Sequence, residues 1–223
     1  MRSRTAFAVA MSIAGLLLGA AAAAAQPAGV WEPAIAEFEA RDRLSPPPSG
    51  QIVFAGSSSI RLWDVEKYFP GLTIINRGFG GSQLSDLVRY ADRIVIAYKP
   101  RIVVVYAGDN DIYGGATSEQ VAIRFEQFVR TVRAALPEVR IIFIGIKPSL
   151  QRWAVVERMR LANGLIRGFA GHDDNIAFVD VDQAMLGWEE TPRPELFVPD
   201  GLHLTAHGYE LWSALLRPLL NAR

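Results

Sequence analysis

A run of glycine and three serines, directly after a short apolar stretch, offers the first candidate nucleophile of the chain. Ile52-Val53-Phe54-Ala55 is expected to form a buried strand, and Gly56-Ser57-Ser58-Ser59 follows it at once. Such a strand end lifts a small hydroxyl off the sheet and points the following backbone N–H groups toward it, as a serine nucleophile needs. Serine clusters after strands also form ordinary turns and helix caps, so this run alone does not establish catalysis.

Further blocks of polar and glycine residues follow the other predicted strands. In open parallel α/β sheets, ligands bind beyond the carboxyl ends of the strands, so these blocks should meet at one edge. The blocks are Asn76-Arg77-Gly78-Phe79-Gly80-Gly81, Gly108-Asp109-Asn110-Asp111, Lys147-Pro148-Ser149 and Asp200-Gly201-Leu202-His203. They add a glycine-rich backbone, a carboxamide and a carboxylate–imidazole pair to the serine hydroxyl, and this combination predicts a hydrolytic site.

The roles of these side chains follow from their chemistry. Ser58 would attack an ester carbonyl, and His203 would take the serine proton and later return one to the leaving alcohol. Asp200 precedes His203 by three residues, so its carboxylate can hold the imidazole in one tautomer. The backbone N–H groups of Ser58 and Gly81 and the side-chain amide of Asn110 are the expected oxyanion donors.

Together the blocks resemble those of the SGNH or GDSL-type serine hydrolases, and the resemblance covers nearly the whole chain after residue 25. The family often has Gly-Asp-Ser where this chain has Gly56-Ser57-Ser58. Alignment on Gly56 makes Ser58 the nucleophile and leaves Ser57 and Ser59 as its neighbours. The other matching blocks are 76–81, 108–111 (Gly-x-Asn-Asp) and 200–203 (Asp-x-x-His).

The resemblance implies a flavodoxin-like three-layer α/β/α sandwich around a central five-stranded parallel sheet. It implies Ser58 as the nucleophile, Gly81 and Asn110 as oxyanion donors, and His203 with Asp200 as the base. It also implies ester hydrolysis through an acyl-enzyme, without a cofactor or a metal. The family includes lysophospholipases, thioesterases, arylesterases and carbohydrate O-acetylesterases.

The residues leave the substrate open. Neutral charge and the lack of a large lid insertion favour an open site for small or medium acyl groups. Removal of acetyl groups from a carbohydrate or cell-envelope polysaccharide is the alternative enzyme reading. A catalytically silent module that binds acyl or glycan ligands is the alternative from another class. A flavin-binding flavodoxin shares the architecture, but no matching phosphate loop follows the first strand.

Alternating apolar and amphipathic runs supply the elements that position these blocks. The predicted strands are continuous and rich in Val and Ile, which is typical of strands buried on both faces of a parallel sheet. They span residues 52–55, 72–75, 102–106, 139–146 and 176–181. The predicted helices span residues 31–44, 84–95 with Ser82 as N-cap, 117–136 with a capping box at Thr117, 153–169, and the segment that Thr205 begins.

The amino-terminal segment predicts export. Residues 1–25 combine Arg2 and Arg4 with an apolar stretch and an alanine-rich end, the layout of a secretory signal peptide. An uncleaved membrane anchor is the alternative. Residues 26–50 then form a helix and a Pro-rich linker, and 51–223 form the hydrolase domain. The protein is therefore expected in the periplasm or secreted, without a membrane span after cleavage.

Composition excludes several classes of partner. Removal of Arg2 and Arg4 leaves 21 basic and 23 acidic residues without a basic stripe, which disfavours nucleic acid. The chain has no cysteine, so no disulfide forms. His203 and His207 with Asp200 could be read as metal ligands, but His203 should precede the last helix, so a metal site is not favoured. The expected partner is a small-molecule ester or an acylated glycan or lipid.

Two further observations at the predicted site edge have alternative explanations. Lys147 could meet an anionic substrate there, although Lys-Pro after a strand is usually only a strand exit. Several aromatic side chains could line an acyl or sugar pocket or simply cover the core. They are Trp63, Tyr113, Trp153, Trp188 and Phe197.

Overall fold

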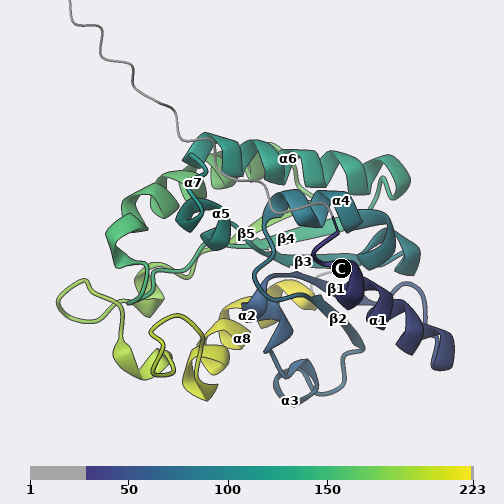
Figure 1. Cartoon of the computed structure of the whole chain (residues 1–223), viewed down its shortest axis with the longest axis horizontal. Helices are drawn as coiled ribbons and strands as arrows, with labels where there is room; N and C mark the ends of the chain where they lie inside the picture. Colours follow the sequence, from purple (N-terminus) through teal and green to yellow (C-terminus); the bar gives the residue numbers. More distant parts are fainter. Residues whose placement is uncertain (1–28, 222–223) are drawn as a thin grey trace, which may run out of the picture.

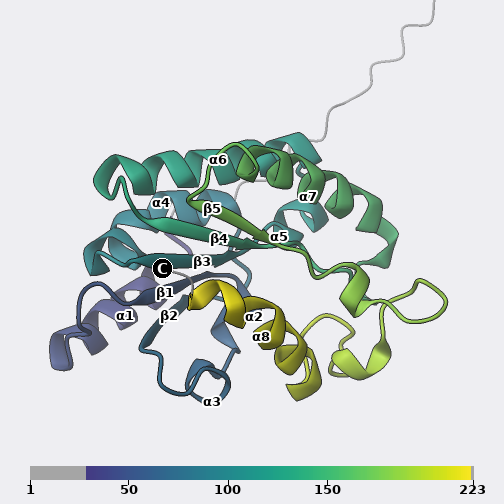
Figure 2. The same ribbon diagram turned by 180° about the vertical axis from the view of Figure 1, so that it is seen from behind.

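Strands and helices alternate along residues 29–221, the part of the chain that the computed structural model describes (Figures 1 and 2). The predicted signal peptide, residues 1–25, lies outside these described residues. The strands are β1 (Ile52–Gly56), β2 (Ile74–Gly78), β3 (Ile102–Tyr106), β4 (Arg140–Ile144) and β5 (Ile176–Val179). The α-helices are α1 (Glu32–Leu44), α2 (Ser58–Arg61), α3 (Val65–Tyr68), α4 (Leu84–Ile94), α5 (Asp109–Tyr113), α6 (Ser118–Ala135), α7 (Val156–Ala170) and α8 (Ala206–Leu220). The 3-10 turns are η1 (Ile96–Tyr98), η2 (Trp153–Val155), η3 (Gln183–Met185) and η4 (Pro194–Leu196).

The five strands form one parallel sheet with the order β2-β1-β3-β4-β5. Every residue of β1 and β3 is buried, as their unbroken apolar sequences predict. The chain winds outward in opposite directions from β1 and β3, so the carboxyl ends of these two strands are the topological switch point of the sheet, where open α/β sheets bind their ligands. The arrangement confirms the predicted three-layer α/β/α sandwich.

Helices cover both faces of the sheet and create two apolar cores. On one face α1, α4, α6 and α7 pack, and Phe125 and Phe128 of α6 are fully buried there. On the other face α2, α3 and α8 pack around Trp63 and Trp212, whose ring centroids are 5.7 Å apart. The apolar side of each amphipathic run in the sequence is therefore the side that its helix packs against the sheet.

One predicted helix cap is wrong and one is confirmed. Gln83, not Ser82, is the N-cap of α4, and its backbone N–H donates to the Asp86 carboxylate (2.9 Å). Ser82 lies in the preceding loop, where its carbonyl accepts a hydrogen bond from Nδ2 of Asn110 (3.0 Å). Thr117 caps α6 as predicted, with Gln120 completing the capping box.

Two strand ends also differ from the sequence prediction. The fourth strand was predicted to reach Ile146, but regular pairing ends at Ile144. Asn163 of α7 binds Ile146 instead, accepting from its N–H (2.7 Å) and donating to its carbonyl (2.9 Å). The fifth strand ends at Val179 rather than at residue 181, and β2 begins two residues later than predicted.

The amino-terminal helix packs against the domain through α4. Ile35 and Phe38 of α1 are buried. Arg93 of α4 pairs with Glu32 and Glu39 of α1. The Pro-rich segment 45–50 then leads into β1. None of the helices within residues 29–221 is both long and apolar enough to cross a membrane. The division into signal peptide, linker and hydrolase domain stays a prediction.

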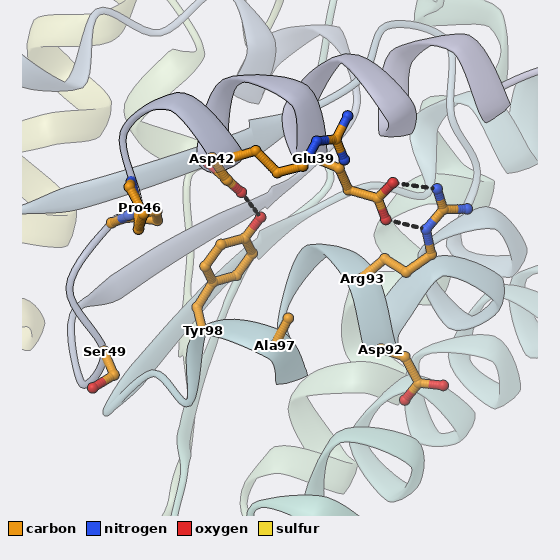
Figure 3. A pocket seen from close by; sticks show the side chains of 10 residues that line it. Glu39, Asp42, Pro46, Ser49, Asp92, Arg93, Ala97 and Tyr98 are labelled. Atoms are coloured by element: carbon orange, nitrogen blue, oxygen red, sulfur yellow. Dashed lines mark hydrogen bonds and ion pairs between the residues drawn. The ribbon is translucent and has the colours of Figure 1, made fainter.

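A groove of about 610 Å³ lies between α1, the Pro-rich segment and the α4–η1 region (Figure 3). Its lining includes Glu39, which pairs with Arg93, and Tyr98, whose hydroxyl donates to Asp42 (2.5 Å). Ser49, also in the lining, precedes β1. The groove therefore lies toward the amino ends of the strands, away from the polar blocks at the carboxyl edge.

Gly78, the last residue of β2, lies directly against the backbone of α2. A Cβ at this position would lie 2.2 Å from the backbone nitrogen of Arg61. Asn76 strengthens the same contact, because its Nδ2 donates to the Ile60 carbonyl (2.8 Å). The end of β2 thereby fixes the short helix that begins at Ser58.

We expect Gly78→Ala to lower the free energy of unfolding by about 1–3 kcal/mol, because the new methyl group forces the Arg61 backbone to move. Gly164→Ala in α7 is the matched control, since a Cβ there meets nothing within 4 Å. This control should gain about 0.5–1 kcal/mol. Urea denaturation of both variants measures the difference, and equal stabilities would contradict the contact's importance.

Candidate active site

Exposure distinguishes the three serines of the predicted nucleophile run. Ser58, the first residue of α2, is half-buried, whereas Ser57 and Ser59 are each 1% exposed. The Ser57 N–H donates to the Tyr106 carbonyl of β3 (3.0 Å). The Ser59 hydroxyl accepts from the Lys147 ammonium (3.2 Å). Ser58 alone among the three is therefore accessible from solvent.

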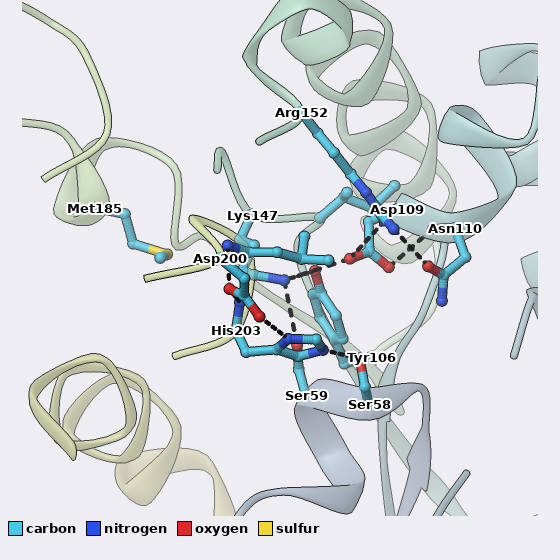
Figure 4. Close-up of polar contacts among 12 residues, drawn as sticks. Ser58, Ser59, Tyr106, Asp109, Asn110, Lys147, Arg152, Met185, Asp200 and His203 are labelled. Carbon is cyan, nitrogen blue, oxygen red and sulfur yellow. Dashed lines mark hydrogen bonds and ion pairs between the residues drawn. The ribbon is translucent and has the colours of Figure 1, made fainter. Parts of the chain in front are cut away.

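Ser58, His203 and Asp200 form one continuous chain of hydrogen bonds (Figure 4). Nε2 of His203 lies 2.9 Å from Ser58 Oγ, and Nδ1 lies 2.6 Å from Asp200 Oδ2. Partial burial raises the pKa of the Asp200 carboxyl, but hydrogen bonds from the His203 imidazole and from the N–H groups of Leu202 and His203 lower it to about 2. The ionised carboxylate only accepts, so it places a proton on Nδ1 and leaves Nε2 able to take the Ser58 proton.

A tight turn before α8 presents Asp200 and His203 on the same side. The Val198 N–H donates to the His203 carbonyl, and the Gly201 N–H donates to the Val198 carbonyl, both at 2.9 Å. The Gln151 N–H, from the loop after β4, donates to the Gly201 carbonyl (3.0 Å). The turn is thus fixed both internally and by a neighbouring loop at the carboxyl edge.

The predicted oxyanion donors lie in adjoining loops. Gly81, at φ +82°, follows β2, and Nδ2 of Asn110 donates to the carbonyl of the next residue, Ser82 (3.0 Å). Within residues 29–221, the N–H groups of Ser58 and Gly81 have no hydrogen-bond acceptor. One Nδ2 hydrogen of Asn110 also stays unshared. These donors are therefore available to a negatively charged oxygen.

Asp111 connects the two loops that carry the predicted oxyanion donors Gly81 and Asn110. Its carboxylate is fully buried and accepts from the Leu84 N–H at the start of α4 (3.1 and 3.3 Å). Arg124 of α6 donates to the same carboxylate (2.8 Å). Asp111 thereby holds the start of a helix that lies 27 residues away in the sequence.

Lys147 differs most from its sequence interpretation. Its side chain is 1% exposed and lies beneath the site rather than at a substrate-binding surface (Figure 4). Its ammonium donates to Ser59 Oγ (3.2 Å), to the Tyr106 hydroxyl (2.9 Å) and to Asp109 Oδ2 (3.3 Å). Burial lowers the pKa of the Lys147 ammonium and raises that of the Tyr106 hydroxyl. Nothing in the local sequence distinguishes this lysine from an exposed one.

Arg152, to which the sequence analysis gave no role, completes a buried ionic cluster. Nη1 lies 3.2 Å from Asp109 Oδ2, and Nη2 donates to Asn110 Oδ1 (2.8 Å). Burial raises the pKa of the Asp109 carboxyl, but the positive charges of Lys147 and Arg152 lower it below its usual value. Asp109 is therefore an ionised carboxylate between two cations.

The aromatic side chains near the site edge differ in exposure, and Trp153 is half-buried with the Arg160 guanidinium 5.5 Å from its ring centroid. Trp63 and Phe197 are buried in the core, so they line no open pocket. Tyr113 and Trp188 are large exposed aromatics, 61% and 100% accessible. Tyr113 belongs to the site, because its ring lies under the Arg152 guanidinium at 4.8 Å.

His203 and His207 make contacts with different partners. His203 contacts Ser58 and Asp200, whereas His207 in the first turn of α8 faces Glu210 at 4.0 Å. Among residues 29–221, no group of three or more His, Asp or Glu side chains is placed to hold a metal ion.

The chain also has recognisable relatives. The model of the GDSL-like lipase/acylhydrolase family matches residues 61–211, which begin three residues after Ser58 and include Asn110 and His203. Platelet-activating factor acetylhydrolase IB subunit alpha2 of Gallus gallus is 26% identical over 167 residues, covering 71% of this chain and 70% of the relative.

Two solved structures share the fold. A GDSL-like lipase from Bacteroides thetaiotaomicron superposes with a TM-score of 0.72 at 20% identity, covering 83% of this chain and 96% of that one. A mutant of an acetyl-xylooligosaccharide esterase from Geobacillus stearothermophilus gives a TM-score of 0.64 at 18% identity, covering 79% and 96%. The family match spans most of the chain, which therefore belongs to the GDSL-like lipase/acylhydrolase family of ester-hydrolysing serine hydrolases.

Proposed function

We propose that the protein is an exported serine esterase in which Ser58 carries the acyl group. The observation that supports this most directly is the unbroken chain from Ser58 Oγ through the His203 imidazole to the Asp200 carboxylate, with contacts of 2.9 and 2.6 Å. A catalytically silent binding module would have no need of this geometry.

The reaction would proceed in two similar halves. His203 Nε2 takes the Ser58 proton as Oγ attacks the ester carbonyl, and the N–H groups of Ser58 and Gly81 with Asn110 Nδ2 receive the oxyanion. His203 then returns the proton to the leaving alcohol. Water then attacks the acyl-enzyme as His203 Nε2 takes its proton, and the acyl–Oγ bond breaks as His203 returns this proton to Ser58 Oγ and the carboxylic acid leaves; Asp200 stabilises the imidazolium in both halves.

The substrate that we propose carries a small or medium acyl group, with acetyl the first choice. The names of two relatives, an acetylhydrolase and an acetyl-xylooligosaccharide esterase, both specify acetyl. Leu150 on the loop after β4 and Tyr113 at the end of α5 are exposed, and both lie near the site because that loop contacts the Asp200 turn and the Tyr113 ring contacts Arg152. They offer apolar surface close to the catalytic residues.

The second candidate is removal of acetyl groups from a carbohydrate or cell-envelope polysaccharide. The name of the Geobacillus esterase favours it. Export also favours it, because polysaccharides of the envelope lie outside the cytoplasm. We base export on residues 1–25 and their signal-peptide pattern.

Ser58→Ala should reduce hydrolysis of p-nitrophenyl acetate by at least about a thousand-fold, because it removes the nucleophile. Ser57→Ala and Ser59→Ala are the matched controls and should keep most of the wild-type rate. Initial rates of the four purified proteins decide the point. Full activity in Ser58→Ala would reject the assignment, and inactivity of the wild type as well would favour a deacetylase that needs its natural alcohol or the silent module.

The acyl preference predicts that kcat/KM falls as the p-nitrophenyl ester lengthens from acetate to octanoate. The same protein should be assayed for acetate release from acetylated xylo-oligosaccharide and for fatty acid release from a lysophospholipid. Acetate release without lysolipid cleavage would select the carbohydrate reading. A preference for the octanoate ester would overturn the small-acyl proposal.

Export predicts a mature protein that begins at Gln26. Expression of the full chain in a bacterium, followed by fractionation and amino-terminal sequencing of the periplasmic protein, tests this directly. Recovery of the intact chain in the membrane fraction would show that residues 1–25 serve as an anchor instead.

A further inference from the structure

The carboxamide of Asn110 lies between a partner that only donates and a partner that only accepts. Nη2 of Arg152 donates to Oδ1 (2.8 Å), and Nδ2 donates to the Ser82 carbonyl (3.0 Å). A guanidinium has no acceptor and a carbonyl has no hydrogen. A flipped amide would set NH2 against the guanidinium and oxygen against the carbonyl. One orientation is therefore selected, and it presents the remaining Nδ2 hydrogen.

Arg152 is itself held in place from the other side. Its Nη1 lies 3.2 Å from Asp109 Oδ2, which also accepts from Lys147 (3.3 Å), and its guanidinium stacks on Tyr113. The side chains of Arg152, Asp109 and Lys147 are 8%, 5% and 1% exposed. Long charged side chains are seldom buried without a partner of opposite charge. The contacts with Asp109 and Tyr113 therefore hold the Arg152 guanidinium in one position.

The Arg152 guanidinium is not arranged to bind a substrate anion. Its Nε and Nη1 atoms are buried, and its Nη2 already donates to Asn110. Its contact with the site is thus through the carboxamide oxygen, on the side away from the unshared Nδ2 hydrogen (Figure 4).

We infer that Arg152 is a positioning residue that fixes the Asn110 carboxamide with its Nδ2 toward the oxyanion, while the Asp109–Lys147 pair fixes Arg152. The inference rests on the proposed function, because it requires Asn110 to be an oxyanion donor. Its effect belongs to the transition state, since the oxyanion exists only there. Loss of Arg152 should accordingly lower kcat and leave KM nearly unchanged.

A double-mutant cycle between Arg152→Met and Asn110→Ala tests the inference with p-nitrophenyl acetate. Methionine removes the donor and leaves Asp109 paired with Lys147. Arg152→Met alone should lower kcat about 10- to 100-fold with KM within about three-fold, and Asn110→Ala alone about 100- to 1000-fold. In the Asn110→Ala background, Arg152→Met should cost no more than about two-fold, because no carboxamide remains to be positioned.

Arg158→Met is the control for loss of a nearby arginine in the same segment. Arg158 donates to the Ala116 carbonyl (2.6 Å) and should leave kcat unchanged in both backgrounds. If circular dichroism shows that Arg152→Met does not fold, Arg152→Lys takes its place in the cycle. Lysine keeps the charge but lacks the planar fork, so a smaller loss of kcat with the same dependence on Asn110 is expected.

The outcomes separate this inference from the proposed function. If Asn110→Ala keeps the wild-type kcat, the proposed oxyanion role of Asn110 is wrong and the inference falls with it. If Asn110→Ala is impaired but the Arg152 variant loses the same factor in both backgrounds, the oxyanion role stands and the positioning role is overturned.

Discussion

The pairing of five parallel strands is the constraint on which the rest of the structure depends. Between two parallel strands, the chain must cross from the carboxyl end of the first back to the amino end of the second. All strands therefore end at the same edge of the sheet. Residues that are far apart in sequence, such as Ser58 and His203, meet there at 2.9 Å. The switch point of the sheet lies between β1 and β3, and the loops that carry the site residues follow these and the neighbouring strands.

The site rests on buried charge as well as on the sheet. Lys147, Asp109 and Arg152 are removed from water and contact one another instead. Burial of these charges costs free energy, and poor contacts among them would leave that cost uncompensated. Lys147 has the Tyr106 hydroxyl as a further hydrogen-bond partner, and Arg152 has the carboxamide oxygen of Asn110. The polar residues at the surface of the site are thereby attached to a rigid interior.

Local sequence patterns predicted the sheet, most helices and the proximity of the triad residues. Continuous Val and Ile runs identify buried strands, and the Asp-x-x-His spacing lets Asp200 reach His203 within one turn. Features that depend on distant partners were missed. The fourth strand ends early, at Ile144, and Asn163 of α7 hydrogen-bonds Ile146 beyond that end. The buried ammonium of Lys147 is paired with the carboxylate of Asp109, 38 residues away in the sequence. Neither partner is evident from residues nearby in the sequence.

The attachment of Asp111 to the start of α4 has a consequence for the energetics of the proposed reaction, in which Gly81 and Asn110 are oxyanion donors. The loops of Gly81 and Asn110 are joined before any substrate is present, through a carboxylate that no solvent reaches. Dipoles that are already oriented need not rotate when negative charge develops, so little reorganisation energy is added to the barrier. Water, in contrast, must turn its molecules around each new charge. The hydrogen-bond donors of the site are thus oriented once, when the chain folds, whereas water molecules would have to be reoriented in every reaction cycle.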